Sequence, residues 1–302
     1  MEYTKDIERT FQLAPETLLS VNNRRGELVV RGEDRNDVAV TAQIRVDAMN
    51  RSSADERFEG FDLPMNESEG RLEIGPPRFD DPHPVVFGFS LSRLMKGPRL
   101  DLLIRVPRQT KLEAENGTGQ LIVDGVEGPS RLAAHRGKIQ ASDLKGSIQI
   151  DGRTGRVEVR SVTGSLKLEA RSGRVDIEDV TGPLDVRTRT GRITVRTVNG
   201  PCRVETRTGK VVVSDVDGPL DLTTRTGAVE YHGRLVHDAN INVRTGMVTL
   251  ALTRDSAFFI DAEARTGKVM ADLPVNYLEK PPEDAAMVRV RTRTGAIRIV
   301  PA

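Results

Sequence analysis

The stretch from residue 189 to 195, "RTGRITV", decides the fold, because near-copies of it recur along the chain. The copies are "RTGRVEV" at 153–159, "RSGRVDI" at 171–177, "RTGKVVV" at 207–213, "RTGAVEY" at 225–231 and "RTGKVMA" at 265–271. A catalytic motif normally occurs once per site. Repetition at a regular spacing therefore indicates architecture before chemistry.

The repeat has a period of 18 residues, divided into two halves of nine. One set of glycines lies at positions 119, 137, 155, 173, 191, 209 and 227, and its spacing then loosens to 246, 267 and 295. A second set lies midway, at positions 128, 146, 164, 182, 200 and 218. Such regularity is the sequence signature of a repeat architecture.

Within each half, apolar and polar residues alternate, as in the pairs Val157 and Val159 or Leu166 and Leu168. This alternation predicts two short strands per unit, and the glycines and Gly-Pro pairs predict the turns between them. A single strand pair cannot bury its apolar face, but stacked units can. The sequence therefore predicts an all-β, single-stranded parallel β-solenoid (β-helix) with coils about 4.8 Å apart. Its handedness does not follow from the sequence, and we favour a right-handed coil.

Two other solenoids share part of this period. A left-handed hexapeptide helix also has 18-residue coils, but these are built from three equal sixes rather than two nines. The calcium-binding nonapeptide roll requires a G-G-x-G-x-D turn, which is absent from this sequence. We therefore expect neither a metal nor another cofactor.

The flanks extend the repeat into one continuous domain of three parts. Residues 1–110 are expected to hold the N-terminal coil or coils with two loop excursions, at about 47–60 and 75–99, and residues 111–275 the regular solenoid. Residues 276–302 are expected to form a loop and a closing coil whose arginines 289, 291 and 293 suit an edge strand. The apolar patch around residues 85–95 is expected to cover an open end or side of the solenoid, with a partner-docking surface as the alternative.

Composition limits the function classes only loosely. The 302 residues carry a net charge of +1, aromatic residues make up 4%, and the single cysteine, Cys202, excludes an internal disulfide. No apolar run is long enough to span a membrane, and the start lacks the pattern of a secretory signal. From the chain as it stands we expect a soluble, cytoplasmic protein.

An arginine stands two residues before each glycine of the first set from Gly155 onward. If the coils stack in register, these residues form a basic column along one edge, and its candidate polyanion-binding or self-association residues are Arg153, Arg171, Arg189, Arg207, Arg225 and Arg244. Arg265 and Arg293 occupy the same motif position. A second basic column follows the glycines, at Arg156, Arg174, Arg192, Lys210 and Lys268, and the opposite edge carries Asp143, Asp179, Asp215 and Asp217. The alternative is that the arginine stems only cover the edge of the sheet.

No catalytic motif is present. The sequence has no G-x-S-x-G, P-loop, G-x-G-x-x-G or H-E-x-x-H pattern. Its four histidines are scattered, and Cys202 occupies a column otherwise filled by isoleucine and leucine, so we expect a core residue. Carboxylates such as Asp176 and Glu158 recur from coil to coil, which favours solvent-facing positions over a unique catalytic pair.

Three stretches of the chain resemble the bacterial DUF4097 family, whose members are labelled putative adhesins. They are "LLSVNNRRGELVVRG" at 18–32, "LDLLIRVPRQTKLEAENGTGQLIVDGVEG" at 100–128, and the repeating TGxVxV and GxLxL segments. The most specific part is the segment from Ile104 to Gly119. The resemblance covers nearly the whole chain, and it implies a β-solenoid, no established catalytic residues and association with the cell envelope.

The sequence thus favours a non-enzymatic scaffold that binds an acidic polymer or a second copy of itself through its basic edge. Sequence-specific nucleic acid binding is not expected. Two alternatives stay open at this point. The chain could be a polysaccharide-active enzyme built on a β-helix, or a filament of the bactofilin kind in which solenoids join end to end.

Overall fold

A computed structural model describes residues 1–12, 17–79, 98–253, 258–272 and 286–302 of the chain. The chain divides into two compact units, Met1–Lys145 (unit 1) and Gly146–Ala302 (unit 2), and each is described by itself. The organisation into one continuous domain with divisions near residues 110 and 275 stays a prediction.

The regular coils of unit 2 are single long strands that bend around one corner. They are β11 (Ile148–Thr163), β12 (Leu166–Thr181), β13 (Leu184–Asn199) and β14 (Cys202–Asp217). Neighbours run parallel, and equivalent residues of successive repeats pair, as Gly173 does with Gly191. This confirms the parallel β-solenoid with 18-residue coils. The expectation of two short strands per coil was wrong, because pairing continues through the R-T-G corner and breaks only at the Gly-Pro corner.

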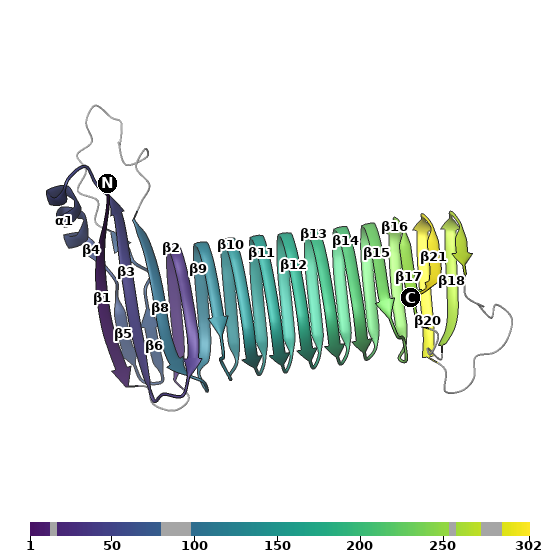
Figure 1. Cartoon of the computed structure of the whole chain (residues 1–302), viewed down its shortest axis with the longest axis horizontal. Coiled ribbons are helices and arrows are strands. Elements are labelled where there is room, and N and C mark those ends of the chain that lie inside the picture. Colours follow the sequence, from purple (N-terminus) through teal and green to yellow (C-terminus); the bar gives the residue numbers. More distant parts are fainter. Residues whose placement is uncertain (13–16, 80–97, 254–257, 273–285) are drawn as a thin grey trace. The chain divides into compact units, whose positions relative to one another are not determined.

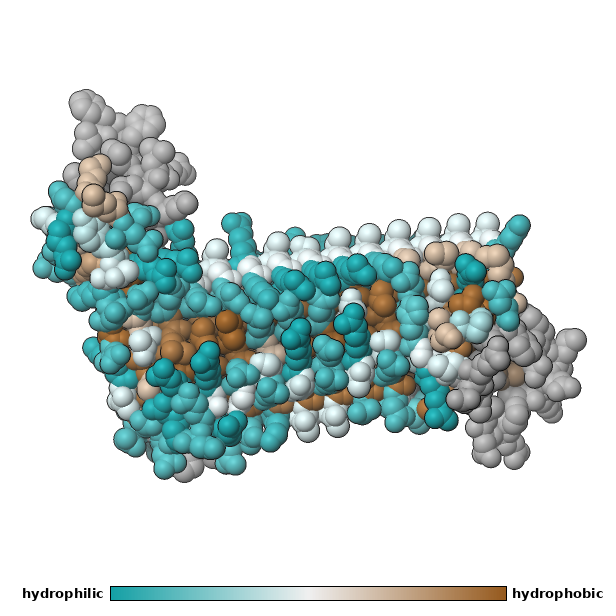
Figure 2. Space-filling model, viewed as in Figure 1, coloured by the Kyte–Doolittle hydropathy of each residue, from teal (hydrophilic) through white to brown (hydrophobic). Residues whose placement is uncertain are grey.

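Apolar side chains from both halves of each coil meet inside unit 2. In β12, Leu166, Leu168, Val175 and Ile177 are all at most 2% exposed. A further column, just before the Gly-Pro corner, is equally buried and consists of Val162, Val180, Val198 and Val216. Over unit 2, the face seen in Figure 2 is mostly hydrophilic, with hydrophobic residues visible between the polar rows. The predicted core register is therefore confirmed.

The C-terminal coils of unit 2 do not stack in chain order. This part contains β15 (Leu220–Gly233), β16 (Ala239–Thr245), β17 (Val248–Leu252), β18 (Phe258–Thr266), β19 (Val269–Ala271), β20 (Ala286–Thr294) and β21 (Ile297–Pro301). The β20–β21 coil pairs with β16–β17 on one side and with β18–β19 on the other. The expectation that arginines 289, 291 and 293 lie on an edge strand was therefore wrong (Figure 1).

Side-chain volume accounts for this order. The inserted β20–β21 coil points Val288, Val290 and Ile297 inward, and each is 0% exposed. At the paired positions the outer coil carries Ile260, Ala262 and Val269. A coil with neighbours on both sides buries its inward side chains more completely, so the bulkier set gains more from the inner position.

Unit 1 is a shorter stack built around the strand β2 (Leu18–Glu33). Parallel to β2 on one side lie β9 (Lys111–Asp124) and then β10 (Ser130–Lys145). On its other side β2 pairs with β6 (Arg71–Ile74) and β8 (Arg99–Pro107). In Figure 1, β2 accordingly lies between β8 and β9 although many residues separate it from both in sequence.

The outer layer of unit 1 is antiparallel. The strand β3 (Asp37–Asp47) pairs with β8 and with β1 (Glu2–Gln12), and β5 (Met65–Ser68) pairs with β6. A separate pair is formed by β4 (Phe61–Asp62) and β7 (Arg78–Phe79). Within residues 1–110, where one or more coils were expected, β2 forms a coil whereas β3 belongs to the antiparallel layer.

The excursion expected at 47–60 contains a helix, α1 (Arg51–Glu59). Asn50 caps it, since its side chain accepts a hydrogen bond from the Ser53 backbone N–H while the Ser53 hydroxyl accepts one from the Asn50 N–H. Ala54 and Phe58 are its buried residues. The apolar patch near residues 85–95, for which a covering role was expected, lies outside the described residues.

Candidate functional site

Eight arginines of unit 2 form a single column at the R-T-G corner, which we call the arginine ladder. The backbone pairing places the residues before and after each arginine opposite their equivalents in the next coil, as Thr188 pairs with Thr206 and Thr190 with Thr208. In spatial order the ladder consists of Arg153, Arg171, Arg189, Arg207, Arg225, Arg244, Arg293 and Arg265. All eight are exposed. The six arginines proposed from the sequence thus lie together, joined by two from the rearranged coils.

The corner is tight because glycines stack directly on glycines. A Cβ atom added to Gly191 would lie 1.8 Å from the carbonyl oxygen of Gly173, and Gly191 has φ +149°. No other residue fits such a position. The glycine column thus fixes the arginine two residues before it at the same place on every coil.

The ladder arginines have no carboxylate partner in the described part of the chain, which sets them apart from the second basic column. In that second column Arg156 Nε lies 2.7 Å from Glu158 Oε1, and Arg174 Nε lies 2.8 Å from Asp176 Oδ2. Lys210 Nζ lies 2.7 Å from Glu230 Oε2. Among the described residues, three of the five charges in the second column are therefore offset by carboxylates, all but Arg192 and Lys268, whereas none of the ladder charges is.

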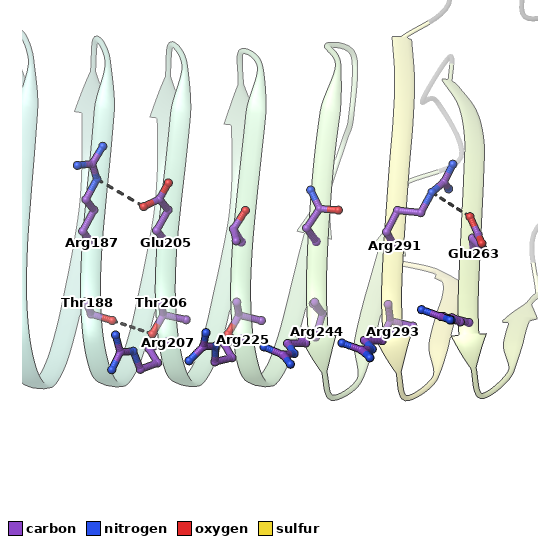
Figure 3. A pocket seen from close by; sticks show the side chains of 16 residues that line it. Arg187, Thr188, Glu205, Thr206, Arg207, Arg225, Arg244, Glu263, Arg291 and Arg293 are labelled. Atoms are coloured by element: carbon purple, nitrogen blue, oxygen red, sulfur yellow. Dashed lines mark hydrogen bonds and ion pairs between the residues drawn. The ribbon is translucent and has the colours of Figure 1, made fainter.

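The ladder borders an open groove of about 870 Å³. Its lining includes seven arginines and only two glutamates, a formal charge of +5 in a chain whose net charge is +1. Figure 3 shows Arg207, Arg225, Arg244 and Arg293 in one row near the turns. The groove is thus suited to anions.

The floor of the groove is a row of small inward-facing residues, mainly threonines. The Thr188 hydroxyl donates a hydrogen bond of 2.9 Å to the Thr206 hydroxyl. Thr224 and Thr292 are 2% and 4% exposed, and their hydroxyl oxygens have no hydrogen-bond partner. Both hydroxyl oxygens are buried, so these threonines form the base of the groove and do not present their hydroxyls at its surface.

The wall opposite the ladder contains ion pairs that involve none of the ladder arginines. Arg187 Nε lies 3.6 Å from Glu205 Oε2, and Arg291 Nε lies 3.2 Å from Glu263 Oε2 (Figure 3). Arg291 also donates a 2.9 Å hydrogen bond to Asp261 Oδ1. This hydrogen bond lowers the pKa of the Asp261 carboxyl below its usual value and raises the pKa of Arg291.

The predicted acidic edge has a conformational cause. Asp143, Asp179 and Asp215 have φ values of +51°, +58° and +54°, in the left-handed region that aspartate tolerates better than most residues. Asp217, two residues after Asp215, lies 3.0 Å from His237 Nε2. These aspartates therefore shape the turns before the Gly-Pro corner.

A second groove, of about 500 Å³, lies at the Gly-Pro corner of unit 2. Its lining is largely apolar and includes Pro183, Leu184 and Cys202. Charges on its rim are paired, since Arg203 Nη2 lies 2.5 Å from Glu205 Oε1. This groove lacks the uncompensated charge of the ladder.

The remaining candidate residues lie apart from one another. Cys202 is 1% exposed, and burial raises the pKa of its thiol to about 12, which confirms a core residue. His135 lies 3.3 Å from Glu115 in unit 1, His237 and exposed His232 belong to unit 2, and His83 lies outside the described residues. Among the described residues, no group of three or more His, Cys, Asp or Glu could hold a metal ion.

Two buried asparagines of unit 1 were missed from the sequence. Asn23 and Asn116 each stand three residues before a corner glycine, where unit 2 has Gly, Ala, Thr or Val. The Asn23 side chain donates to the Leu100 carbonyl oxygen, and Asn116 donates to the carbonyl oxygens of Gly26 and Gln120. Their place within the segments "VNNRRG" and "AENGTG" was the available signal.

The sequence of these coils matches a known family. The family model of Toastrack DUF4097 matches residues 17–299. The chain belongs to this family. No curated protein matches it. No helix of the described residues is long and apolar enough to cross a membrane.

Solved structures of low identity cover nearly all of this Toastrack chain. A "putative adhesin" from Bacteroides fragilis is 10% identical, with 98% of this chain and 97% of that chain covered and a TM-score of 0.31. A "putative cell adhesion protein" from Clostridium sporogenes is 12% identical, with coverages of 99% and 100% and a TM-score of 0.21. A "putative lipid binding protein" from Parabacteroides distasonis is also 12% identical, with coverages of 99% and 96% and a TM-score of 0.26.

Proposed function

We propose that this Toastrack protein is a non-enzymatic binding scaffold that holds an extended anionic polymer along its arginine ladder. The observation that carries the proposal is the row of eight exposed arginines without a carboxylate partner among the described residues. A protein that needed only solubility or structural support at this corner would pair these charges, as it does three residues further along in Arg156 and Arg174.

Electrostatics supplies the reason why the ladder favours an anion. Two unit charges one coil apart, at about 4.8 Å, repel by about 0.9 kcal/mol in water. The repulsion accumulates along the row and is reduced when an anion lies between neighbours. Arginine also binds carboxylate, sulfate and phosphate groups through two parallel hydrogen bonds.

The spacing of the ladder favours a flexible polymer over duplex DNA. Coils repeat at about 4.8 Å, whereas phosphates follow each other every 3.4 Å along the axis of one duplex strand. A stiff duplex therefore cannot match the ladder contact by contact. A flexible acidic polymer can adjust its anionic groups to the coil spacing.

The enzyme alternative is less well supported by the side chains. The carboxylates of Glu158 and Asp176, considered as a catalytic pair, are both bound by Arg156. The filament alternative requires an open edge that can pair with another copy. In unit 1 the outer strand β1 carries five charged residues of both signs among its 11 and is mostly exposed, which discourages such pairing.

The test is retention on columns of immobilised polyanions at increasing salt. The ladder variant replaces Arg171, Arg189, Arg207 and Arg225 by Gln. We expect the wild type to bind at low salt and to be retained less as the salt approaches physiological ionic strength. The ladder variant should elute at a lower salt concentration than the wild type.

A control with the same change in formal charge replaces Arg156, Arg174, Arg192 and Lys210 by Gln, and it should keep most of the binding. If both variants lost the same amount of retention, net charge alone would account for the binding. Sedimentation of the protein alone at low salt shows whether the ladder instead binds a second copy of the chain. Envelope association, implied by the family resemblance, belongs to this proposal and is tested by cell fractionation.

A further inference from the structure

The surroundings of the arginine ladder change along its length. The residue two positions before each ladder arginine lies on the opposite wall of the corner. Along the stack this wall reads Asp151, Glu169, Arg187, Glu205, Thr223, Asn242, Arg291 and Glu263. Carboxylates therefore accompany Arg153, Arg171, Arg207 and Arg265. Arg187 accompanies Arg189 between two of these coils, whereas Arg225, Arg244 and Arg293 form three successive positions without a carboxylate.

The coil insertion produces this carboxylate-free stretch. Thr292 of β20 pairs with Val243 on one side and Ala264 on the other, so Arg293 lies between Arg244 and Arg265. If the coils had stacked in chain order, Arg244 would have been followed by the coil that carries Glu263. In the observed order the coil that carries Arg291 lies between these two coils, and Arg291 binds both Glu263 and Asp261.

The same stretch offers hydrogen-bonding groups that are not charged. Thr223 and Asn242 are exposed, and no hydrogen bond or ion pair engages their side chains within the described residues. Thr224 and Thr292 lie beneath them with buried hydroxyls, so the exposed side chains of Thr223 and Asn242 supply the polar contacts. Hydroxyl and amide groups of this kind pair with hydroxyls of a ligand.

We infer that the groove formed by β15, β16 and β20 is the principal binding centre of the ladder and takes an unbranched acidic polysaccharide. This rests on the proposed function and narrows it. Anionic groups of the polysaccharide contact Arg225, Arg244 and Arg293, and its hydroxyls contact the exposed side chains of Thr223 and Asn242. A polymer without hydroxyls, such as inorganic polyphosphate, satisfies only the arginines.

The experiment compares two triple variants of the full chain by isothermal titration. One variant replaces Arg225, Arg244 and Arg293 by Gln. The other, as a matched control, replaces Arg153, Arg171 and Arg189 by Gln, which removes the same side chain from the same corner and changes the charge by the same amount. The probes are polygalacturonate, which carries carboxylates and hydroxyls, and long-chain polyphosphate. We expect the first variant to lose at least about tenfold in affinity for polygalacturonate, because three charge-assisted contacts are removed, and the second to lose less than about threefold.

A second pair of substitutions tests the recognition of hydroxyls. Thr223→Ala with Asn242→Ala should weaken polygalacturonate binding several-fold and leave polyphosphate binding unchanged. Equal losses in the two arginine variants would refute the localised centre while leaving the proposed scaffold function intact. Tighter binding of polyphosphate than of polygalacturonate would refute the polysaccharide assignment. If the wild type bound neither probe at low salt, the proposed function itself would fail.

Discussion

Replacement of Gly191 by alanine tests the corner on which the whole ladder depends. The added Cβ would lie 1.8 Å from the Gly173 carbonyl oxygen, whereas Cβ contacts below 3.0 Å hardly occur in proteins. Strands β12 and β13 would have to separate by about 1.2 Å at this corner, which breaks the hydrogen bonds that join them there. Alanine also adopts a positive φ only at a cost of about 1–2 kcal/mol.

The expected loss of stability is therefore the sum of two effects. Two backbone hydrogen bonds left unmade in a partly buried corner cost about 2–3 kcal/mol together, so Gly191→Ala should destabilise unit 2 by roughly 3–5 kcal/mol. Gly70 provides the matched control, because it has φ +74° and nothing lies within 4 Å of its added Cβ. Gly70→Ala should cost only the dihedral strain, about 1–2 kcal/mol.

Urea denaturation followed by far-UV circular dichroism measures both variants against the wild type. A Gly191→Ala protein within about 1 kcal/mol of wild type would show that the coils can part freely at the corner. The glycine column would then recur for a reason other than close stacking. Equal losses in the two variants would show that dihedral strain alone matters.

Three further outcomes follow from single side chains. Leu168, which is 0% exposed, should not tolerate aspartate, and a Leu168→Asp protein that melts like the wild type would contradict the register of the core. Cys202 should react with a thiol reagent at pH 8 only after unfolding, because burial raises its pKa to about 12, and alkylation of the native protein at the rate of a free thiol would contradict its position. Hydrogen bonding by Arg291 lowers the pKa of Asp261, so the stability that this pair gives to the outer coil should be present above pH 3.8, the ordinary value, and be lost as the pH falls through the lower folded-state pKa. The difference in Tm between wild type and Asp261→Asn measures this contribution, and a difference that grew on acidification would contradict it.

The regular half of the molecule could be predicted from the sequence because one physical requirement repeats there. Only glycine fits a corner at which neighbouring carbonyl groups come so close, and the inward positions need apolar side chains, so each coil must repeat the same letters. The columns of Leu168 and Arg171 follow directly once the period is known. Stacking in register needs nothing beyond equal spacing, and equal spacing is visible in the sequence.

The strand order in both units could not be predicted in this way. In unit 1 the segment between β2 and β9 supplies β6 and β8, which lie parallel to β2 on its far side, and the antiparallel strands β3 and β5 beyond them. Periodicity carries no information about which edge a strand joins. Segments 34–36 and 48–50 show no repeat, and the helix between Arg51 and Glu59 depends on a local cap at Asn50. The strand order and the helix therefore depend on loop length and local hydrogen bonding rather than on the repeat.

At the C-terminal end of unit 2, the available clue was side-chain volume rather than spacing. Glycines 246, 267 and 295 are separated by more than one period. The connections between these coils are therefore long enough for the last coil in sequence to insert between the two coils that precede it. Ala262 and Ala264 mark a coil with a thin core, and Val288 and Val290 mark one with a full core. The coil with the larger buried side chains takes the inner position, because neighbours on both sides bury more of its apolar surface and stabilise it more.

This exchange of positions has a consequence for the ladder. The carboxylates of Asp261 and Glu263 belong to the coil that would otherwise follow Arg244, and the inserted coil holds both through Arg291. Packing inside the solenoid thus separates acidic side chains from the arginine row outside it. The volumes of buried side chains thereby determine where along the corner the positive charge is least compensated. This is where the proposed anionic ligand would gain most from binding.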